Sequence, residues 1–256
     1  MKLAFLLAGF TIAFGYAQDG RVPVIVELFT SEGCSSCPPA ERLLNQLSDR
    51  QPVAGARIIP LEEHVDYWNQ LGWTDPFSSA LYRGRQNEYA TRLFFTDNIY
   101  TPQMIVGGQV GFSGGNAKKA QDEIAHAIQA QRVFVDLKAS LNRTDSELVD
   151  LAVQVTNAKD LKLHNSNVYL AVTESGLSTN VGGGENSGRW LSHAPVVRSF
   201  GVIGKLDSKG SNGGQIVNTM RLPHEWQRQN LRAVVFVQER DSYKITGAAT
   251  ADLQGR

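Results

Sequence analysis

The segment Val24-Ile25-Val26-Glu27-Leu28-Phe29-Thr30-Ser31-Glu32-Gly33-Cys34-Ser35-Ser36-Cys37-Pro38-Pro39 places both cysteines of the 256-residue chain directly after an apolar run typical of a strand. A disulfide between Cys34 and Cys37 closes a very short loop, for which the chain-entropy model gives about 2 kcal/mol of stabilisation, against roughly 4.7 for a long loop. It is therefore poorly placed as a structural crosslink. Between a strand and a helix, the same pair can switch between dithiol and disulfide with little movement of the fold. A redox-active dithiol is the leading hypothesis.

The first 17 residues have the pattern of a secretory signal peptide. Lys2 precedes the apolar stretch Leu3 to Phe14, and Gly15-Tyr16-Ala17 supplies small residues where signal peptidase cleaves. The apolar stretch is shorter than the roughly 20 residues of a membrane helix, and no later stretch is suited to span a membrane. A retained anchor is the alternative. We expect an exported protein, periplasmic or extracellular, with residues 1–17 removed and no membrane span thereafter.

Charge and length narrow the possible partners. Cleavage after Ala17 removes Lys2 from the 25 basic residues and none of the 25 acidic ones, which leaves a net charge of −1. This balance argues against nucleic acid or an anionic membrane surface as partner. A chain of this length can bury its own core, so the cysteine pair does not mark a small disulfide scaffold. The oligomeric state is left open.

The hydrophobic pattern changes near residue 132 and predicts two domains, 21–131 and 132–256. In the first, apolar spacing predicts alternating strands and helices in the order β-α-β-α-β-β-α, at 24–29, 40–47, 57–61, 78–94, 104–106, 109–112 and 116–130. In the second, seven short β-type runs are broken by Gly, Asn and Asp, at 133–137, 148–155, 168–173, 196–203, 215–220, 231–238 and 246–251. They predict an all-β sandwich, immunoglobulin-like in shape.

The element order of 21–131, with Cys-x-x-Cys at the first strand-to-helix junction and Pro102 opening the third strand, resembles the thioredoxin-like fold. The segments 26–40 and Gly184-Glu185-Asn186-Ser187-Gly188-Arg189 are together similar to an exported bacterial family catalogued as domain of unknown function 1223. The resemblance implies a thioredoxin-like α/β domain followed by the β-domain. It brings no activity with it.

If the resemblance holds, Cys34 is the attacking thiolate and Cys37 the resolving thiol, near a helix N-terminus that favours an anion. The pair between the cysteines is Ser35-Ser36, and no histidine or lysine stands beside Cys34. Pro38 is expected to keep Cys37 out of the helical backbone region, with Cys37 as cap and Pro38 as the first helical residue. The direction of redox chemistry is left open. An inert disulfide and a metal site are the alternatives for the pair.

The resemblance also implies supporting residues. Thioredoxins carry a buried acid on the first strand, which exchanges a proton with the resolving thiol, and Glu27 is the candidate here, although shifted by one residue. A slip of one residue reverses the face of a strand, so a strand-end glutamate that reaches solvent or a basic partner is the alternative. The bond before Pro102 is expected to be cis, and Thr101 to contact an extended partner peptide. An ordinary strand-opening proline is the other interpretation.

Two further segments attract functional hypotheses. The aromatic segment 64–77 could place Trp68 and Trp73 along a groove beside the dithiol, or could fold onto its own small core. His64 with Cys34 and Cys37 makes the rival copper or zinc site. The glycine-rich segment 181–193 is expected to be a long hairpin loop, with the alternative that Arg189 and His193 face the dithiol or a partner. His126, His164 and His224 have no ligand-like spacing and receive no role.

Together these patterns predict an exported protein that performs thiol–disulfide exchange on protein or peptide partners, with no organic cofactor. The alternatives are a copper-binding carrier module and a binding protein with a non-catalytic disulfide.

Overall fold

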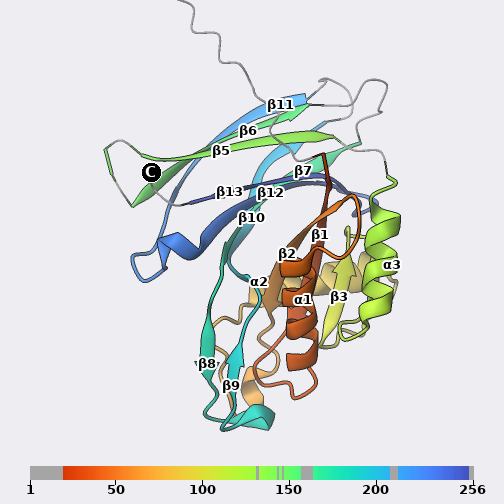
Figure 1. Ribbon diagram of the computed structural model, residues 1–256, viewed down its shortest axis with the longest axis vertical. Helices are drawn as coiled ribbons and strands as arrows, with labels where there is room; N and C mark the ends of the chain where they lie inside the picture. The colour runs from red at the N-terminus through yellow and green to blue at the C-terminus, as the bar shows by residue number, and fades with distance from the viewer. Residues whose placement is uncertain are drawn as a thin grey trace, which may run out of the picture.

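A computed structural model describes residues 20–130, 133–142, 144–145, 147–156, 164–207 and 213–253. The predicted signal peptide lies outside these residues. The fold is mixed α/β, built on one large sheet and a second, smaller β-sheet that lies over part of it (Figure 1).

The large sheet has eight strands, in the spatial order β13 (Ile245–Asp252), β12 (Leu231–Glu239), β7 (Ser166–Glu174), β10 (Val196–Leu206), β2 (Ala56–His64), β1 (Val22–Thr30), β3 (Gln103–Val106) and β4 (Val110–Ser113). The smaller sheet orders β11 (Gly213–Arg221), β6 (Leu148–Thr156) and β5 (Phe134–Leu141). A separate two-stranded hairpin joins β8 (Ser178–Asn180) and β9 (Trp190–Ser192).

The helices are α1 (Pro38–Arg50), α2 (Ala80–Glu88), which continues into a π-helical turn, η2 (Tyr89–Leu93), and α3 (Ala117–Ala127). Single 3-10 turns are η1 (Asn69–Leu71), η3 (Gly184–Asn186) and η4 (Arg228–Asn230). The observed order of strands and helices through α3 is the predicted β-α-β-α-β-β-α, and Asn116 caps α3 as expected by accepting the backbone N–H of Lys119.

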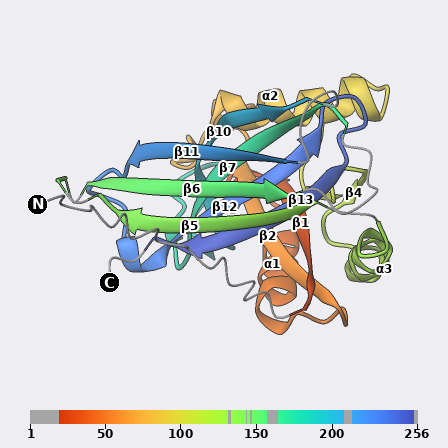
Figure 2. The same cartoon turned by 90° about the horizontal axis from the view of Figure 1, so that it is seen from above.

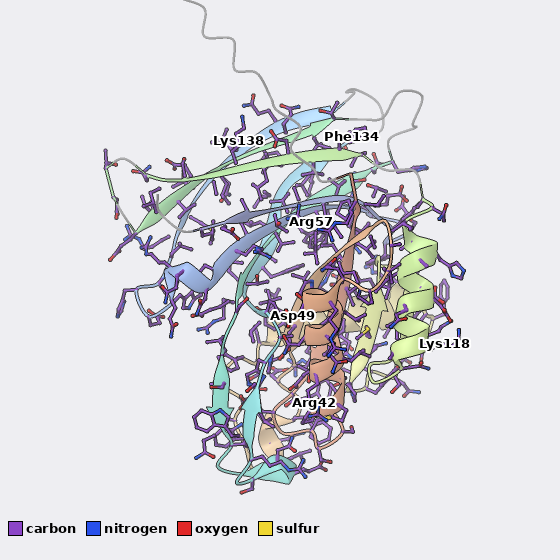
Figure 3. The ribbon with its side chains drawn as sticks, viewed as in Figure 1. Arg42, Asp49, Arg57, Lys118, Phe134 and Lys138 are labelled. Carbon is purple, nitrogen blue, oxygen red and sulfur yellow. A yellow bond between two sulfur atoms is a disulfide. The ribbon has the colours of Figure 1, made fainter. Side chains whose placement is uncertain are left out.

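The helices cover the two faces of the β1–β4 part of the sheet. Strand β1 pairs in parallel with β2 and antiparallel with β3. Because side chains alternate along a strand, Val26 and Leu28 face α1, whereas Ile25 and Phe29 face α2. Seen from above, α2 lies on one side of the sheet and α1 and α3 on the other (Figure 2). The outward positions of α1 and α3 carry charged residues, among them Arg42, Asp49 and Lys118 (Figure 3).

The seven β-type runs downstream form strands β5, β6, β7, β10, β11, β12 and β13, as predicted. Alternating valines and leucines from the two sheets interdigitate in one core, which includes Leu151, Val153, Val235 and Val237. The arrangement differs from a self-contained sandwich, because β10 pairs with β2 through Val196 and Glu62. Strands of the predicted first and second domains thus share one sheet. A division into two independent folding units stays a prediction.

None of the helices in the described residues is both long and apolar enough to cross a membrane.

Candidate functional site

The two cysteines form a disulfide in the turn between β1 and α1, with their Cα atoms 5.4 Å apart. Cys37 is the cap residue and Pro38 begins α1, as expected. The expectation that Pro38 keeps Cys37 out of the helical region is wrong, since Cys37 has φ −77° and ψ −40°. Three hydrogen bonds hold this conformation: the Cys37 N–H donates to the Cys34 carbonyl, and the N–H groups of Ala40 and Glu41 donate to the Cys37 carbonyl.

This turn provides few free donors for a thiolate. Pro38 and Pro39 have no N–H, and the next two N–H groups already bind the Cys37 carbonyl. The hydroxyl of Ser36, by contrast, lies 3.4 Å from the Cys34 sulfur. In the dithiol state this hydroxyl is positioned to donate a hydrogen bond to a Cys34 thiolate.

A cap hairpin, defined here as residues 178–192, packs against the turn that contains the disulfide. The amide nitrogen of Asn186 donates to the carbonyls of Glu32 and Cys34, at 2.8 and 2.9 Å. The carboxylate of Glu185 accepts the Ser35 N–H at 2.9 Å. Both cysteines are 0% exposed. The long hairpin loop is thus confirmed, and its contacts with the dithiol turn come from Glu185 and Asn186.

Gly183 allows the cap hairpin to pack closely against the backbone at Gly72. A Cβ atom on Gly183 would lie 2.2 Å from the carbonyl oxygen of Gly72, so only glycine permits this approach. Arg189 is exposed, and its guanidinium donates to the side-chain oxygen of Asn186. It therefore orients the amide that binds the dithiol turn.

Trp68 lies beside this turn and is hydrogen-bonded to Thr101, which precedes Pro102. The Thr101–Pro102 bond is cis. The indole N–H of Trp68 donates to the Thr101 hydroxyl at 2.8 Å, and the side chain of Trp68 packs against Gly33. The indole N–H of Trp73 donates to the Glu32 carboxylate at 2.7 Å. Both tryptophans are half-buried next to the segment that precedes Cys34, and their role in substrate binding stays a prediction.

Glu27 lies on the face of β1 opposite α1. Its carboxylate binds the Arg85 guanidinium and accepts a 2.7 Å hydrogen bond from the Tyr89 hydroxyl. The structure therefore places this acid on the α2 side of the sheet, with a basic partner. Proton exchange between Glu27 and Cys37 stays an untested prediction.

Glu63 lies beside this pair, and burial together with the nearby Glu27 charge raises its pKa well above the ordinary value. Neither of its carboxyl oxygens has a hydrogen-bond partner among the described residues.

His64 belongs to a buried network of ionisable side chains that the sequence pattern did not predict. Its two ring nitrogens bind Asp75 at 2.7 Å and Glu62 at 2.8 Å. Burial disfavours the charged ring, but these two carboxylates hold the pKa of His64 well above its ordinary value. Since both nitrogens are engaged, a metal site shared by His64 with Cys34 and Cys37 would require at least one of these contacts to break. That site stays untested.

His193 continues the network from the end of the cap hairpin. Its nitrogens lie 3.1 Å from Glu62 and 3.0 Å from Glu32, and these partners raise its pKa to about 9 against the opposing effect of burial. On α1, burial and the charge of Glu62 raise the pKa of Glu41 to about 7. Two patterns in the sequence could have indicated these residues: the i+4 spacing of Glu41 from Cys37, and the polar run Glu62-Glu63-His64 at the end of a strand, in which Glu62 and His64 share a face.

Fold and site together define a mixed α/β protein with a buried Cys-x-x-Cys disulfide at the start of a helix. The family described as "Protein of unknown function (DUF1223)" matches residues 25–238, and the chain belongs to this family.

Solved structures similar to the chain include protein AGR_C_4864 of Agrobacterium tumefaciens, with 26% identity and a TM-score of 0.66, covering 94% of this chain and 97% of that one. HBP35 of Porphyromonas gingivalis has 14% identity and a TM-score of 0.61, covering 91% of this chain and 76% of the other, and shows likeness of fold alone. No curated protein sequence matches the chain significantly.

Proposed function

We propose that this protein is an exported, thioredoxin-like thiol–disulfide exchange protein that acts on protein or peptide partners through Cys34 and Cys37. The observation that carries the proposal is the disulfide in the short turn that leads into α1. A turn held at both ends by a strand and a helix can open and close this bond without rearranging either element.

The chemistry proceeds in two balanced steps. The Cys34 thiolate attacks one sulfur of a partner disulfide, forms a mixed disulfide and releases the other partner sulfur as a thiolate. The Cys37 thiolate then attacks the Cys34 sulfur, which closes the Cys34–Cys37 disulfide and releases the second partner sulfur. Two electrons pass to the partner, and the reverse sequence oxidises a partner dithiol. Ser36, 3.4 Å from the Cys34 sulfur, supports the anionic form of the attacking residue.

Access to the sulfurs requires the cap hairpin to move, since both cysteines are fully covered. Three hydrogen bonds join the cap hairpin to the dithiol turn and must break: two from Asn186 and one to Glu185. Ser35 and Ser36 are already exposed on the outer side of the turn. In this proposal the segment after residue 132 contributes the hairpin that controls access, and Thr101 with Trp68 contacts the incoming chain.

Thiol labelling of the purified protein in glutathione buffers tests the proposal. We expect a reversible two-electron transition between a fully labelled and an unlabelled form under native conditions, abolished in Cys34→Ser and Cys37→Ser. Ser35→Ala, which keeps both cysteines and the backbone N–H that binds Glu185, is the matched control and should titrate like the unaltered protein. A disulfide that stays closed across all native buffers, and reacts only after denaturation, would identify a permanent disulfide and refute the proposal.

A further inference from the structure

The buried network below the cap hairpin contains six ionisable side chains from four separate parts of the chain. All six are at most 4% exposed: Glu32, Glu41, Glu62, His64, Asp75 and His193. Three of them direct ligand atoms toward one point, because the nearest ligand atoms of Glu62, His64 and His193 all lie within 4.8 Å of one another.

These three donors have the geometry of a metal-binding set. Glu62 and His64 are two residues apart on β2 and therefore share a face of the strand. Glu62 Oε1 lies 2.8 Å from His64 Nε2 and 3.1 Å from His193 Nδ1. Around a tetrahedral zinc ion with bonds of about 2.0–2.1 Å, neighbouring ligand atoms are roughly 3.3 Å apart. The two contacts to Glu62 need to lengthen by about 0.2–0.5 Å to admit the ion, and the inward nitrogens of the two histidines already lie within 4.8 Å of each other.

In each histidine, the ring nitrogen that points away from Glu62 is hydrogen-bonded to a carboxylate, as is usual for histidines that bind a metal. His64 Nδ1 meets Asp75 at 2.7 Å, and His193 Nε2 meets Glu32 at 3.0 Å. A carboxylate on the far nitrogen fixes the ring and makes the inward nitrogen a better ligand. Asp75 is itself held by the backbone N–H groups of Glu32 and Phe77.

Glu41 supplies a fourth ligand, its carboxylate oxygen. Its Oε2 atom lies 3.8 Å from His193 Nδ1, while its other oxygen accepts a 2.6 Å hydrogen bond from the Thr30 hydroxyl. A surface cavity of about 620 Å³ borders His193.

We propose that Glu62, His64 and His193, completed by Glu41, bind one divalent transition-metal ion of the zinc type. Two imidazoles and two carboxylates favour such an ion over Mg²⁺ or Ca²⁺, which prefer oxygen ligands alone. The four ligands form a closed, buried site, as structural zinc sites do. Because Glu62 and His64 come from β2 and His193 follows β9, the ion links the cap hairpin to the sheet. The cysteines take no part.

Metal binding by the full chain tests the proposal with Zn²⁺ as the probe. Protein stripped with a chelator is titrated calorimetrically, and the bound metal per chain is measured after dialysis. We expect one equivalent of Zn²⁺, retained in the Cys34→Ser/Cys37→Ser double variant and not displaced by excess Mg²⁺. His64→Gln and His193→Gln should lose the saturable binding, while the exposed controls His126→Gln and His224→Gln should keep it. Asp75→Asn should weaken the affinity about 10- to 100-fold.

Two measurements keep the proposal falsifiable if the ligand variants do not fold. The Co²⁺-loaded, unaltered protein should show the visible absorption of four-coordinate cobalt without a thiolate charge-transfer band. Circular dichroism reports which variants are folded. Absence of stoichiometric Zn²⁺, loss of binding only when the cysteines are removed, or a thiolate band in the cobalt spectrum would each overturn the assignment.

Discussion

Replacement of Asn186 by alanine should speed reduction of the Cys34–Cys37 disulfide. The side chain of Asn186 is 0% exposed and donates to two backbone carbonyls, those of Glu32 and Cys34, in the turn that contains the disulfide. Without the amide, both carbonyls lose their side-chain donor while the cap hairpin is closed, whereas water binds them when it is open. Reduction requires the open form, so the substitution favours the reactive state.

The magnitude follows from the two lost donors. The buried Glu32 carbonyl loses its donor, which costs about 1–3 kcal/mol, whereas the Cys34 carbonyl keeps the Cys37 N–H and loses one hydrogen bond of about 1 kcal/mol, so we take roughly 2–4 kcal/mol for the pair of carbonyls. If the hairpin opens and closes faster than reductant attacks, this amount is removed from the free energy of opening. Since about 1.4 kcal/mol is a factor of ten, the rate of reduction should rise about 30- to 700-fold.

The assay is reduction by excess dithiothreitol at 25 °C, with timed alkylation and mass spectrometry to count free thiols. Low concentrations of urea distinguish local opening from global unfolding, because a local opening exposes little surface and its rate changes little with denaturant. Asn180→Ala is the matched control, since Asn180 is exposed in the same hairpin, and should react at the unaltered rate. An unchanged rate in Asn186→Ala, or an increase that follows global unfolding in urea, would refute the reasoning.

Three further changes test other contacts. Ser36→Ala should slow the attack of reduced Cys34 on a small-molecule disulfide at pH 7 by about 2- to 10-fold, which corresponds to the loss of one hydrogen bond. Stopped-flow thiol assays measure this rate. A rate equal to that of the unaltered protein would exclude a role for the hydroxyl that lies 3.4 Å from the sulfur. Arg85→Leu leaves Glu27 buried without its cation and should lower the free energy of unfolding in urea by about 3–5 kcal/mol. The control Arg83→Leu, at a side chain 45% exposed, should lower it by less than about 1 kcal/mol. Similar losses for both variants would contradict the role of the buried pair. Glu63→Gln should stabilise the protein at pH 8 and much less at pH 5. Folding raises the pKa of the Glu63 carboxyl, so this group destabilises the folded state as the pH rises above the ordinary glutamate pKa near 4.5. The exposed control Glu225→Gln should show no such difference, and a Glu63→Gln gain independent of pH would count against this explanation.

Local patterns in the sequence predicted the elements well, because strand and helix periodicities depend on neighbouring residues. The apolar run before Cys34, the cap at Asn116 and the seven downstream β-type runs all lie in the expected elements. The joining of both segments into one sheet was not predictable in this way. It depends on the pairing of Val196 with Glu62, residues far apart in the chain, and periodicity carries no information about such a partner.

Within the site, too, features set by local sequence were predictable and features set by contacts between distant residues were not. Cys34, Cys37 and the cis bond at Pro102 follow from local motifs and a fold resemblance. The cap on the disulfide and the network around Glu62 depend on His193 and Asn186, which reach the site through tertiary packing. The conformation of Cys37 was missed for a different, local reason, since hydrogen bonds within the turn outweigh the steric preference of a residue before proline.

Capture of a mixed disulfide on Cys34 is the decisive test of thiol–disulfide exchange by this protein. Purified Cys37→Ser protein is incubated, without denaturant, with a peptide that contains a disulfide, and the adduct is mapped by tandem mass spectrometry. We predict one covalent adduct per chain, with the peptide sulfur joined to Cys34, and little or no adduct at Cys37 in Cys34→Ser under the same conditions. Failure of folded Cys37→Ser to form any adduct, or equal reaction of the two variants, would contradict thiol–disulfide exchange through Cys34.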